Sequence, residues 1–231
     1  MSDHVEQFEH AGLLVCIDYD TDAESCREWD NLGRMMCWHS RYYLGDYDSD
    51  NRRMETHDGT NCADPSDFQE WWKEHGKGGI LLPLYLYDHS GLTISCSPFS
   101  CPWDSGQVGY VYMTAEKIRE EYSAKRISKK LRKRVTEYLV NEVKTYDEYL
   151  RGDVYGYTVS TLEPLEDEDD LRDLDEREDE QLDSCWGFYG LDYCIQEAKS
   201  VAEHNQKSRK EKADAEAEEL GVQEAVGLGH A

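Results

Sequence analysis

Three aspartates, Asp46, Asp48 and Asp50, occupy alternate positions and could supply oxygen ligands to a calcium ion. Their spacing matches positions 1, 3 and 5 of a calcium-binding loop, which also needs Gly at position 6 and a bidentate Glu at position 12. This chain has Asn51 and His57 at those two places. Because both geometrically demanding positions fail, the pattern favours a polar loop over a calcium site.

A second aspartate pair, Asp18 and Asp20, lies at the end of the apolar run LLVCID, residues 13 to 18. This D-x-D pattern resembles the first motif of phosphotransferases of the haloacid dehalogenase type, in which one aspartate is the nucleophile and its second neighbour is the acid. That fold needs parallel strands joined by crossover helices, whereas the central strands expected here are too close in sequence to be parallel. A solvated strand end is the better interpretation. A small enzyme, with a site around Trp103, Asp104, Ser105 and this strand end, is the alternative function.

Other candidate sites for catalysis or cofactors lack the required spacing. Cys37, His39 and Cys62 do not have the spacing of a structural zinc site, and none of the eight cysteines belongs to a C-x-x-C pair. Asp88, His89 and Ser90 have the residue types of a catalytic triad. The side chains of adjacent residues at a hairpin tip point apart, however, whereas those of a triad must converge. Phosphate-binding Gly-rich motifs are absent from the sequence. We therefore predict no cofactor, and free thiols in a reducing compartment.

The most distinctive feature is an acidic block from Glu163 to Asp183. Thirteen of its 21 residues are Asp or Glu, opposed only by Arg172 and Arg177, so it carries −11 of the chain's net charge of −25. Such a block can bind a partner with carboxylates standing where nucleic-acid phosphates would stand. The predicted partner-binding residues in it are Glu166, Asp167, Glu168, Asp169, Asp170, Asp173, Asp175 and Glu176.

Trp103 and Asp104 are the other candidate partner-binding residues, in the loop Ser100 to Ser105 between two expected strands. An exposed Trp there would be a natural hot spot for a partner, whereas a buried one would plug the sheet. The flanking Pro102 and Gly106 slightly favour a loop that folds back onto the sheet. Exposure of Trp103 therefore decides between the two interpretations.

One basic cluster, KRISKKLRKR at residues 125 to 134, reverses the sign of the charge. We expect it to pair with the acidic block within the folded protein, although exposed ion pairs contribute only about 0 to 1 kcal/mol each. The net charge of −25 opposes direct binding to nucleic acid. A third interpretation, that acidity only keeps the protein dissolved in a salty cytoplasm, is disfavoured by eight Cys and twelve Lys.

Hydrophobic periodicity predicts an α+β fold. Helices are expected at 65–75, 115–122 and 127–151, the last with a strong amphipathic pattern. Short turns make the three central strands an antiparallel meander. The predicted strands are 13–18, 79–88, 91–99, 106–114, 154–162 and 184–190.

Together these elements predict one antiparallel sheet of five or six strands with the long helix 127–151 packed on one face. Residues 1–190 are expected to form a single domain, with an acidic loop at 163–183. Residues 191–231 are expected to form a charged C-terminal helix that frays beyond His204 into a disordered tail. The polar N-terminus and the absence of a long apolar run predict a cytoplasmic protein that does not bind membranes.

Four segments carry a resemblance to known proteins: AESCREWDNLGRMMCWHSRYYLGD (23–46), LPLYLYDHSGLTIS with PFSCPWDSGQVGYVY (82–95, 98–112), EYLRGDVYGYTV (148–159) and DSCWGFYG (183–190). They resemble an uncharacterised protein family of tailed bacteriophages and related mobile elements, over about residues 12 to 190. The resemblance implies no activity and no functional residue, but it implies the cytoplasm of an infected bacterium. In that setting we expect a non-enzymatic accessory protein that binds a basic or nucleic-acid-binding host protein. An acidic DNA mimic that blocks a host defence, restriction or CRISPR, would be one form of it.

Overall fold

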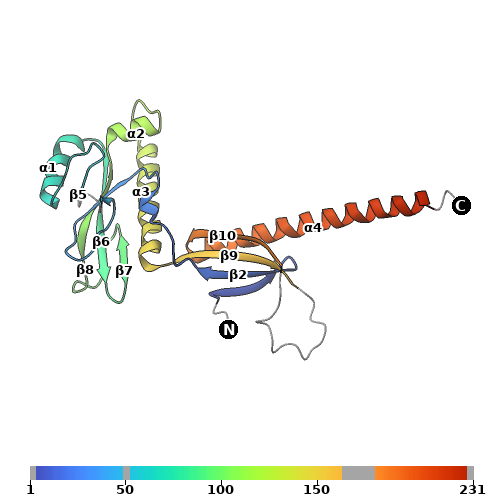
Figure 1. The fold of residues 1–231 in the computed structure, drawn as a ribbon. Coiled ribbons are helices and arrows are strands. Elements are labelled where there is room, and N and C mark those ends of the chain that lie inside the picture. Colours follow the sequence, from blue (N-terminus) through green and yellow to red (C-terminus); the bar gives the residue numbers. More distant parts are fainter. Residues whose placement is uncertain (1–3, 49–52, 163–179, 228–231) are drawn as a thin grey trace. The chain divides into compact units, whose positions relative to one another are not determined.

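The structure is a computed structural model that describes residues 4–48, 53–162 and 180–227. The chain forms two compact units (Figure 1). We call residues 24–152 the inserted unit, and residues 1–23 together with 153–231 the terminal unit. The sequence had suggested other boundaries, with residues 1–190 in one domain and the C-terminal helix outside it.

The terminal unit is built on a four-stranded antiparallel sheet in the order β1-β2-β9-β10. The central strands β2 and β9 pair from Leu13 opposite Thr161 to Tyr19 opposite Tyr155. Beyond that pair, the backbone N–H of Asp20 donates to the carbonyl of Val154 at 2.8 Å. The chain therefore leaves this sheet and returns to it at neighbouring strand ends. The strands are β1 (Glu6–His10), β2 (Leu13–Tyr19), β9 (Val154–Thr161) and β10 (Gln181–Tyr189).

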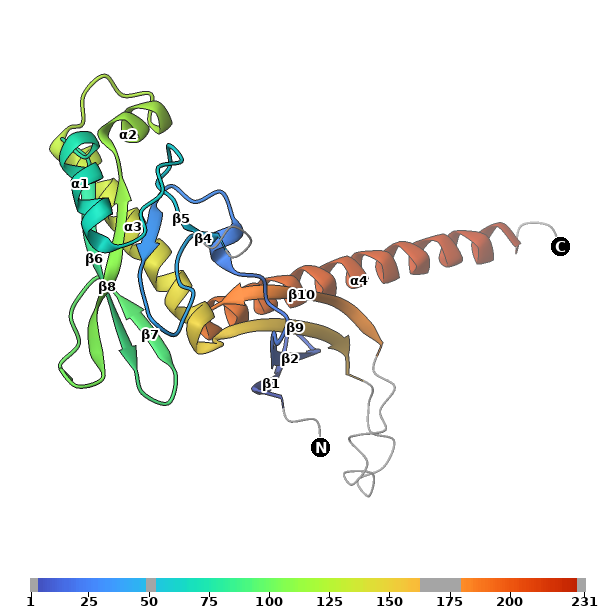
Figure 2. The ribbon, with the colours of Figure 1, turned by 60° about the vertical axis from the view of Figure 1, so that its left-hand side comes forward.

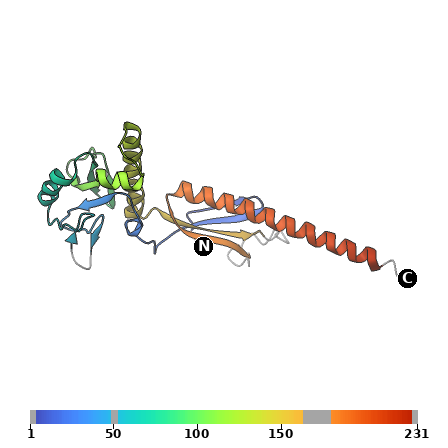
Figure 3. The same cartoon turned by 90° about the horizontal axis from the view of Figure 1, so that it is seen from above.

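Helix α4 (Leu191–Gly227) covers one face of this sheet (Figures 1 and 3). Because side chains alternate along a strand, one face of β2 and β9 is fully apolar, and small residues spaced by four on α4 let the helix approach it closely. The resulting core contains Leu13, Val15, Ile17, Tyr155, Tyr157, Val159, Cys194, Ala198 and Ala202. The C-terminal helix is thus a layer of the fold.

Helix α4 continues through Gly227, beyond His204, where we had expected the helix to fray. Side chains from Arg209 to Glu218 are exposed, so no core holds this part. Its Ala, Glu and Lys residues are strong helix formers. An exposed pair between Lys207 and Glu211, 3.9 Å apart, also fits the spacing of neighbouring helical turns.

The inserted unit holds a second four-stranded antiparallel sheet, in the order β3-β8-β6-β7, and a two-stranded sheet of β4 and β5. The prediction of a single sheet of five or six strands is therefore wrong, although the α+β class and the antiparallel pairing are confirmed. The strands are β3 (Arg34–Cys37), β4 (Tyr47–Asp48), β5 (Arg53–Met54), β6 (Ile80–Asp88), β7 (Leu92–Ser95) and β8 (Ser105–Met113).

The predicted meander of the three central strands is also wrong, because β8 pairs with β6 and not with β7. β6 and β8 have nine residues each and pair from Ile80 opposite Met113 to Tyr87 opposite Ser105, whereas β7 has only four residues. Strand β8 can therefore form more backbone hydrogen bonds along the free edge of β6 than it could form along the shorter β7.

Two helices cover opposite faces of this sheet, α1 (Pro65–His75) and α3 (Lys129–Arg151), as Figure 2 also shows. The carboxylate of Asp64 caps α1 by accepting from the Ser66 and Asp67 N–H groups at 2.7 and 3.2 Å. His75, the last residue of α1, is exposed. Residues buried in the helices include Phe68 and Trp71 of α1 and Val135, Leu139, Val143 and Tyr146 of α3.

The predicted helices at 115–122 and 127–151 are confirmed. Ser128 and the left-handed Gly152 (φ 75°) bound α3, and Thr114 caps α2 (Ala115–Glu121). The segment before β3 contains only a 3-10 turn, η1 (Cys26–Glu28), and the N–H groups that follow it bind a side chain of α3. None of the described helices is long and apolar enough to cross a membrane.

Candidate functional site

Trp103 stands in the loop between β7 and β8, and it is 91% exposed. Two bonds hold the loop: the N–H of Asp88 at the end of β6 donates to the carbonyl of Asp104 at 2.8 Å, and the hydroxyl of Ser105 donates to the carbonyl of Cys101. These bonds satisfy the backbone without folding the loop over the sheet. The interpretation of Trp103 as a plug is therefore wrong, and its exposure leaves a large apolar side chain in solvent.

A groove of about 360 Å³ lies beside Trp103, with Arg41, Leu86 and Asp88 among its lining residues. The guanidinium of Arg41 pairs with the carboxylate of Asp88 and lies over the ring of Tyr42, 5.4 Å from its centre. Asp104 faces His89 at 3.5 Å. Aromatic and Arg side chains are the residues enriched in binding hot spots, so the composition of the groove suits a protein interface.

The same kind of surface continues into a neighbouring cavity of about 510 Å³. The two hollows share Trp38, His39 and Ser40 as lining residues. Tyr43, 71% exposed, stacks on Tyr47 with ring centres 4.5 Å apart. We call this area the Trp103 surface; it comprises Trp38, His39, Arg41, Tyr42, Tyr43, Tyr47, Asp88, Trp103 and Asp104.

The predicted acidic partner-binding residues, from Glu166 to Glu176, lie outside the described residues. The flanking strands β9 and β10 pair with each other, and Thr161 and Glu180 exchange bonds of 3.0 and 3.1 Å at the end of the pair. Both ends of the acidic block are therefore attached to neighbouring strands of one sheet. The predicted pairing of this block with residues 125–134 stays a prediction.

The charge is divided unequally between the two units. The inserted unit has 18 Lys and Arg against 21 Asp and Glu, a net charge of −3, whereas the terminal unit has 7 against 29, a net charge of −22. The acidity of the chain is thus a property of the terminal unit, while the Trp103 surface belongs to a nearly neutral unit.

The candidate catalytic and metal-binding residues are engaged elsewhere. Asp18 bonds His4 at 2.7 Å in the terminal unit, and Asp46 binds Arg27 in the inserted unit. Burial raises the pKa of the Cys37 thiol to about 12 and that of Cys62 to about 11, so both are neutral near pH 7. Over residues 4–48, 53–162 and 180–227, no three His, Cys, Asp or Glu side chains form a group that could hold a metal ion.

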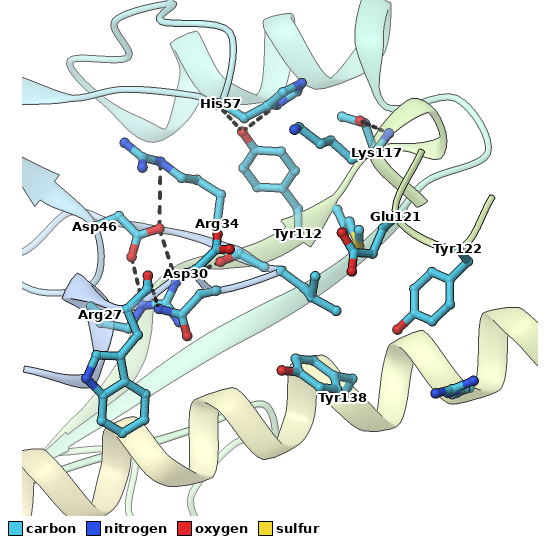
Figure 4. A pocket seen from close by; sticks show the side chains of 17 residues that line it. Arg27, Asp30, Arg34, Asp46, His57, Tyr112, Lys117, Glu121, Tyr122 and Tyr138 are labelled. Carbon is cyan, nitrogen blue, oxygen red and sulfur yellow. Dashed lines mark hydrogen bonds and ion pairs between the residues drawn. The ribbon is translucent and has the colours of Figure 1, made fainter. Parts of the chain in front are cut away.

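Sequence reasoning missed a cavity of about 660 Å³ in the inserted unit (Figure 4). One wall of it is an ionic cluster: Arg27, with its side chain only 4% exposed, binds Asp46 and also donates to the Gly33 carbonyl at 2.7 Å. Glu142 of α3 accepts from the N–H groups of Leu32 and Gly33 at 2.7 and 3.0 Å. Burial alone would lower the pKa of Arg27, but Asp46 and Glu142 raise it, so the guanidinium stays charged.

The only sequence signal for this cavity was the segment 23–46, singled out for its resemblance, which contains Arg27, Arg34 and Asp46. Comparison of the chain with protein families, with curated proteins and with solved structures finds no match. Its function must therefore be argued from the geometry of its own residues.

Proposed function

We propose that this protein is a non-enzymatic binding protein that engages a partner protein through the Trp103 surface. The observation that carries the proposal is the 91% exposure of Trp103 beside a groove lined by Arg41 and Leu86. A solvent-exposed indole costs free energy that a partner pocket would recover, roughly 3 kcal/mol on full burial. The loop bonds described above hold its backbone in place, so little further ordering opposes binding.

The partner we propose is a basic or nucleic-acid-binding host protein. Asp104 and Asp88 flank the indole, and the net charge of −22 on the terminal unit attracts basic proteins over a distance. The resemblance to proteins of tailed bacteriophages supplies the setting, a bacterial cytoplasm in which the partner is a component of host defence. Imitation of DNA by the acidic block, Glu163 to Asp183, is part of the same proposal.

These two contributions differ in their response to salt. Contact through the indole is short-ranged and apolar, so it depends little on ionic strength, whereas attraction by the acidic block is screened beyond about 8 Å at physiological salt. Removing the indole should weaken binding by a similar factor at every salt concentration. Deleting residues 165–181 should instead flatten the dependence of affinity on salt.

The test is affinity capture from a bacterial lysate across a salt series, followed by titration of the purified partner. We expect Trp103→Ala to lower the affinity for the partner at least tenfold, and Trp103→Phe to retain most of that affinity. Tyr193→Ala, which removes an aromatic ring that is 54% exposed on the terminal unit, is the matched control and should have little effect.

Two outcomes would contradict parts of the proposal. Equal affinity of wild type and Trp103→Ala for the captured partner would place the contact elsewhere. An unchanged salt dependence after deletion of residues 165–181 would remove the imitation of DNA and leave the acidic block as a solvated segment.

A further inference from the structure

The 660 Å³ cavity lies between α3, the loop from Arg27 to Arg34, and the end of β8 with α2. It has no lining residue in common with the groove beside Trp103, so the two are separate places on the inserted unit. Its volume is within the range of small-molecule sites, about 300 to 1,000 Å³.

One side of the cavity is basic. Figure 4 shows Arg34, Lys117 and His57 on the same side as the hydroxyl of Tyr112. Arg34 is oriented through its Nε, which donates to the Glu55 carbonyl at 2.9 Å; in the part of the chain that the structure describes, its two terminal nitrogens have no hydrogen-bond partner. Burial lowers the pKa of His57, and Lys117 and Arg34 lower it further against the opposing effect of Asp58. His57 is therefore neutral near pH 7, and Arg34 and Lys117 supply the positive charge that suits this end of the cavity to an anion.

The Tyr112 hydroxyl adds a positioned polar group to this basic side. It accepts from the backbone N–H of His57 at 3.1 Å and lies 3.3 Å from the imidazole Nδ1. The side chain is buried, and burial raises the pKa of Tyr112, so the hydroxyl keeps its proton.

The opposite side offers a ring and two carboxylates. Tyr138 of α3 is 46% exposed and faces the basic side across the cavity, with Tyr122 at one end of it (Figure 4). Arg134 already covers the ring of Tyr122, 5.3 Å from its centre, whereas no described side chain stacks on Tyr138. Asp30 and Glu121 also line the cavity, and among the described residues neither forms a hydrogen bond or an ion pair through its side chain.

Opposite charges thus line one cavity, and among the described residues they pair across it only where the Arg34 Nε lies 3.6 Å from the Asp46 carboxylate. No ion pair joins Asp30 or Glu121 to Arg34, Lys117 or Arg134 within the described chain. By contrast, Arg27 and Asp46 in the cavity wall form a direct ion pair. The cavity thus has a basic side and, opposite it, an acidic and aromatic side. Such a cavity is complementary to a ligand that has an anionic group at one end and hydrogen-bond donors at the other.

We propose that this cavity binds a mononucleotide. Its phosphate contacts Arg34, Lys117 and His57, and its base stacks on Tyr138. Asp30 and Glu121 accept hydrogen bonds from the hydroxyls of the sugar or from the amine of the base.

Simpler ligands would contact only some of the groups that line the cavity. Inorganic phosphate would occupy the basic side alone, and an amino acid would reach the carboxylates but bring no ring system for Tyr138 in most cases. The chain has no Gly-rich phosphate loop, so a phosphate must be held by side chains, as Arg34, Lys117 and His57 can do. A nucleotide phosphate can contact the terminal nitrogens of Arg34 and also Lys117, which lies 3.5 Å from Glu120 in an exposed ion pair. The base and sugar of the same ligand can reach Tyr138, Asp30 and Glu121.

The test is calorimetric titration of the full chain with the four ribonucleoside monophosphates, with adenosine, and with inorganic phosphate. We expect at least one monophosphate to bind, at least tenfold more tightly than either adenosine or phosphate alone. Lys117→Gln and Tyr138→Ala should each weaken it about tenfold, since stacking on an aromatic ring is worth about 1 to 3 kcal/mol per base. Both side chains are about half exposed, so these variants should keep the fold, which circular dichroism verifies.

Lys129→Gln and Tyr193→Ala are matched controls, because each removes an exposed side chain of the same chemical type outside the cavity. Both should bind as wild type does. Failure of all four monophosphates to bind at millimolar concentration overturns the proposal. Equal weakening by Lys117→Gln and Lys129→Gln, or inorganic phosphate binding as tightly as the nucleotides, overturns it as well. Trp103→Ala should leave nucleotide binding intact, so failure of one proposal does not decide the other.

Discussion

The guanidinium of Arg27 donates to both carboxylate oxygens of Asp46, from Nε at 2.7 Å and from Nη2 at 3.1 Å. The same carboxylate accepts from the backbone N–H of Met35 at 2.9 Å, so it joins the η1 segment to the start of β3. Their side chains are only 4% and 8% exposed. This pair therefore fixes the position of the loop that forms one wall of the 660 Å³ cavity.

Asp46→Asn should destabilise the inserted unit by about 3 kcal/mol, because it leaves the buried guanidinium of Arg27 with less compensating charge. Urea unfolding measures the change. Lys133→Gln, which removes an exposed pair with Glu137 at 3.6 Å, is the control and should cost less than about 1 kcal/mol. Equal midpoints for Asp46→Asn and wild type would show that the buried pair does not hold the unit together.

Gly109→Ala should separate β3 from β8. Gly109 lies opposite Cys37 on one side and Leu84 on the other, and a Cβ there would come 1.9 Å from the carbonyl oxygen of Met36. Since backbone atoms must move, we expect a loss of about 3 kcal/mol or an insoluble protein. Gly106→Ala, on the same strand with nothing within 4 Å of its Cβ, is the control. A thermal unfolding midpoint for Gly109→Ala equal to that of Gly106→Ala would rule out this close approach.

Asp58 should make the stability of the inserted unit depend on pH. Burial alone would raise its pKa, but hydrogen bonds from Thr56, Thr60 and the indole of Trp71 outweigh burial and hold the pKa below its usual range. Because the folded pKa is below the unfolded value of about 3.9, the stabilisation is complete above about pH 5 and is lost as the pH falls through the folded pKa.

Asp58→Asn tests this dependence, because it places an amide near the Trp71 N–H and removes the charge. We expect a loss of about 1 kcal/mol at pH 7 that shrinks as the pH is lowered below 4. Asp67→Asn, in the first turn of α1, controls for a general loss of negative charge. A difference between Asp58→Asn and wild type that stays constant from pH 7 to pH 3 would contradict the assigned pKa.

The two units should fold separately when the chain is divided. Asp20 and Val154 are joined by a 2.8 Å bond at neighbouring strand ends, so a short Gly-Ser linker can replace residues 24–152. We expect both fragments to unfold cooperatively in calorimetry, and added salt to stabilise the terminal unit more because of its charge of −22. A terminal unit that is unfolded without residues 24–152 at every salt concentration would show that it depends on the inserted unit.

Local patterns in the sequence predicted the helices and the longer strands, missed the short strands β1, β3, β4 and β5, and predicted the assembly poorly. The spacing of Val135, Leu139, Val143 and Tyr146, with Ser128 and Gly152 at the two ends, was sufficient for α3. The partner of β2 could not be found in this way, because Tyr19 pairs with Tyr155 across the whole inserted unit. A run of apolar residues predicts a strand but does not identify its neighbour.

The candidate sites show the same limit. Trp103 was identified from its residue type and its loop, but its exposure depends on bonds to Asp88 and between Cys101 and Ser105 that no spacing rule predicts. The nucleotide cavity was missed because its groups come from distant segments, with Arg34, Lys117 and Tyr138 on three different elements. None of these residues belongs to a motif that would mark it alone.

The long separation between β2 and β9 also affects the order in which the protein can fold during synthesis. A ribosome adds about 5 to 20 residues per second, so β9 emerges on the order of ten seconds after β2. Until then β1 and β2 form at most an isolated hairpin, which is marginally stable in water and has an unpaired edge. The inserted unit has all its strands and helices available during this interval. The sheet of the terminal unit therefore closes last, after the inserted unit has folded.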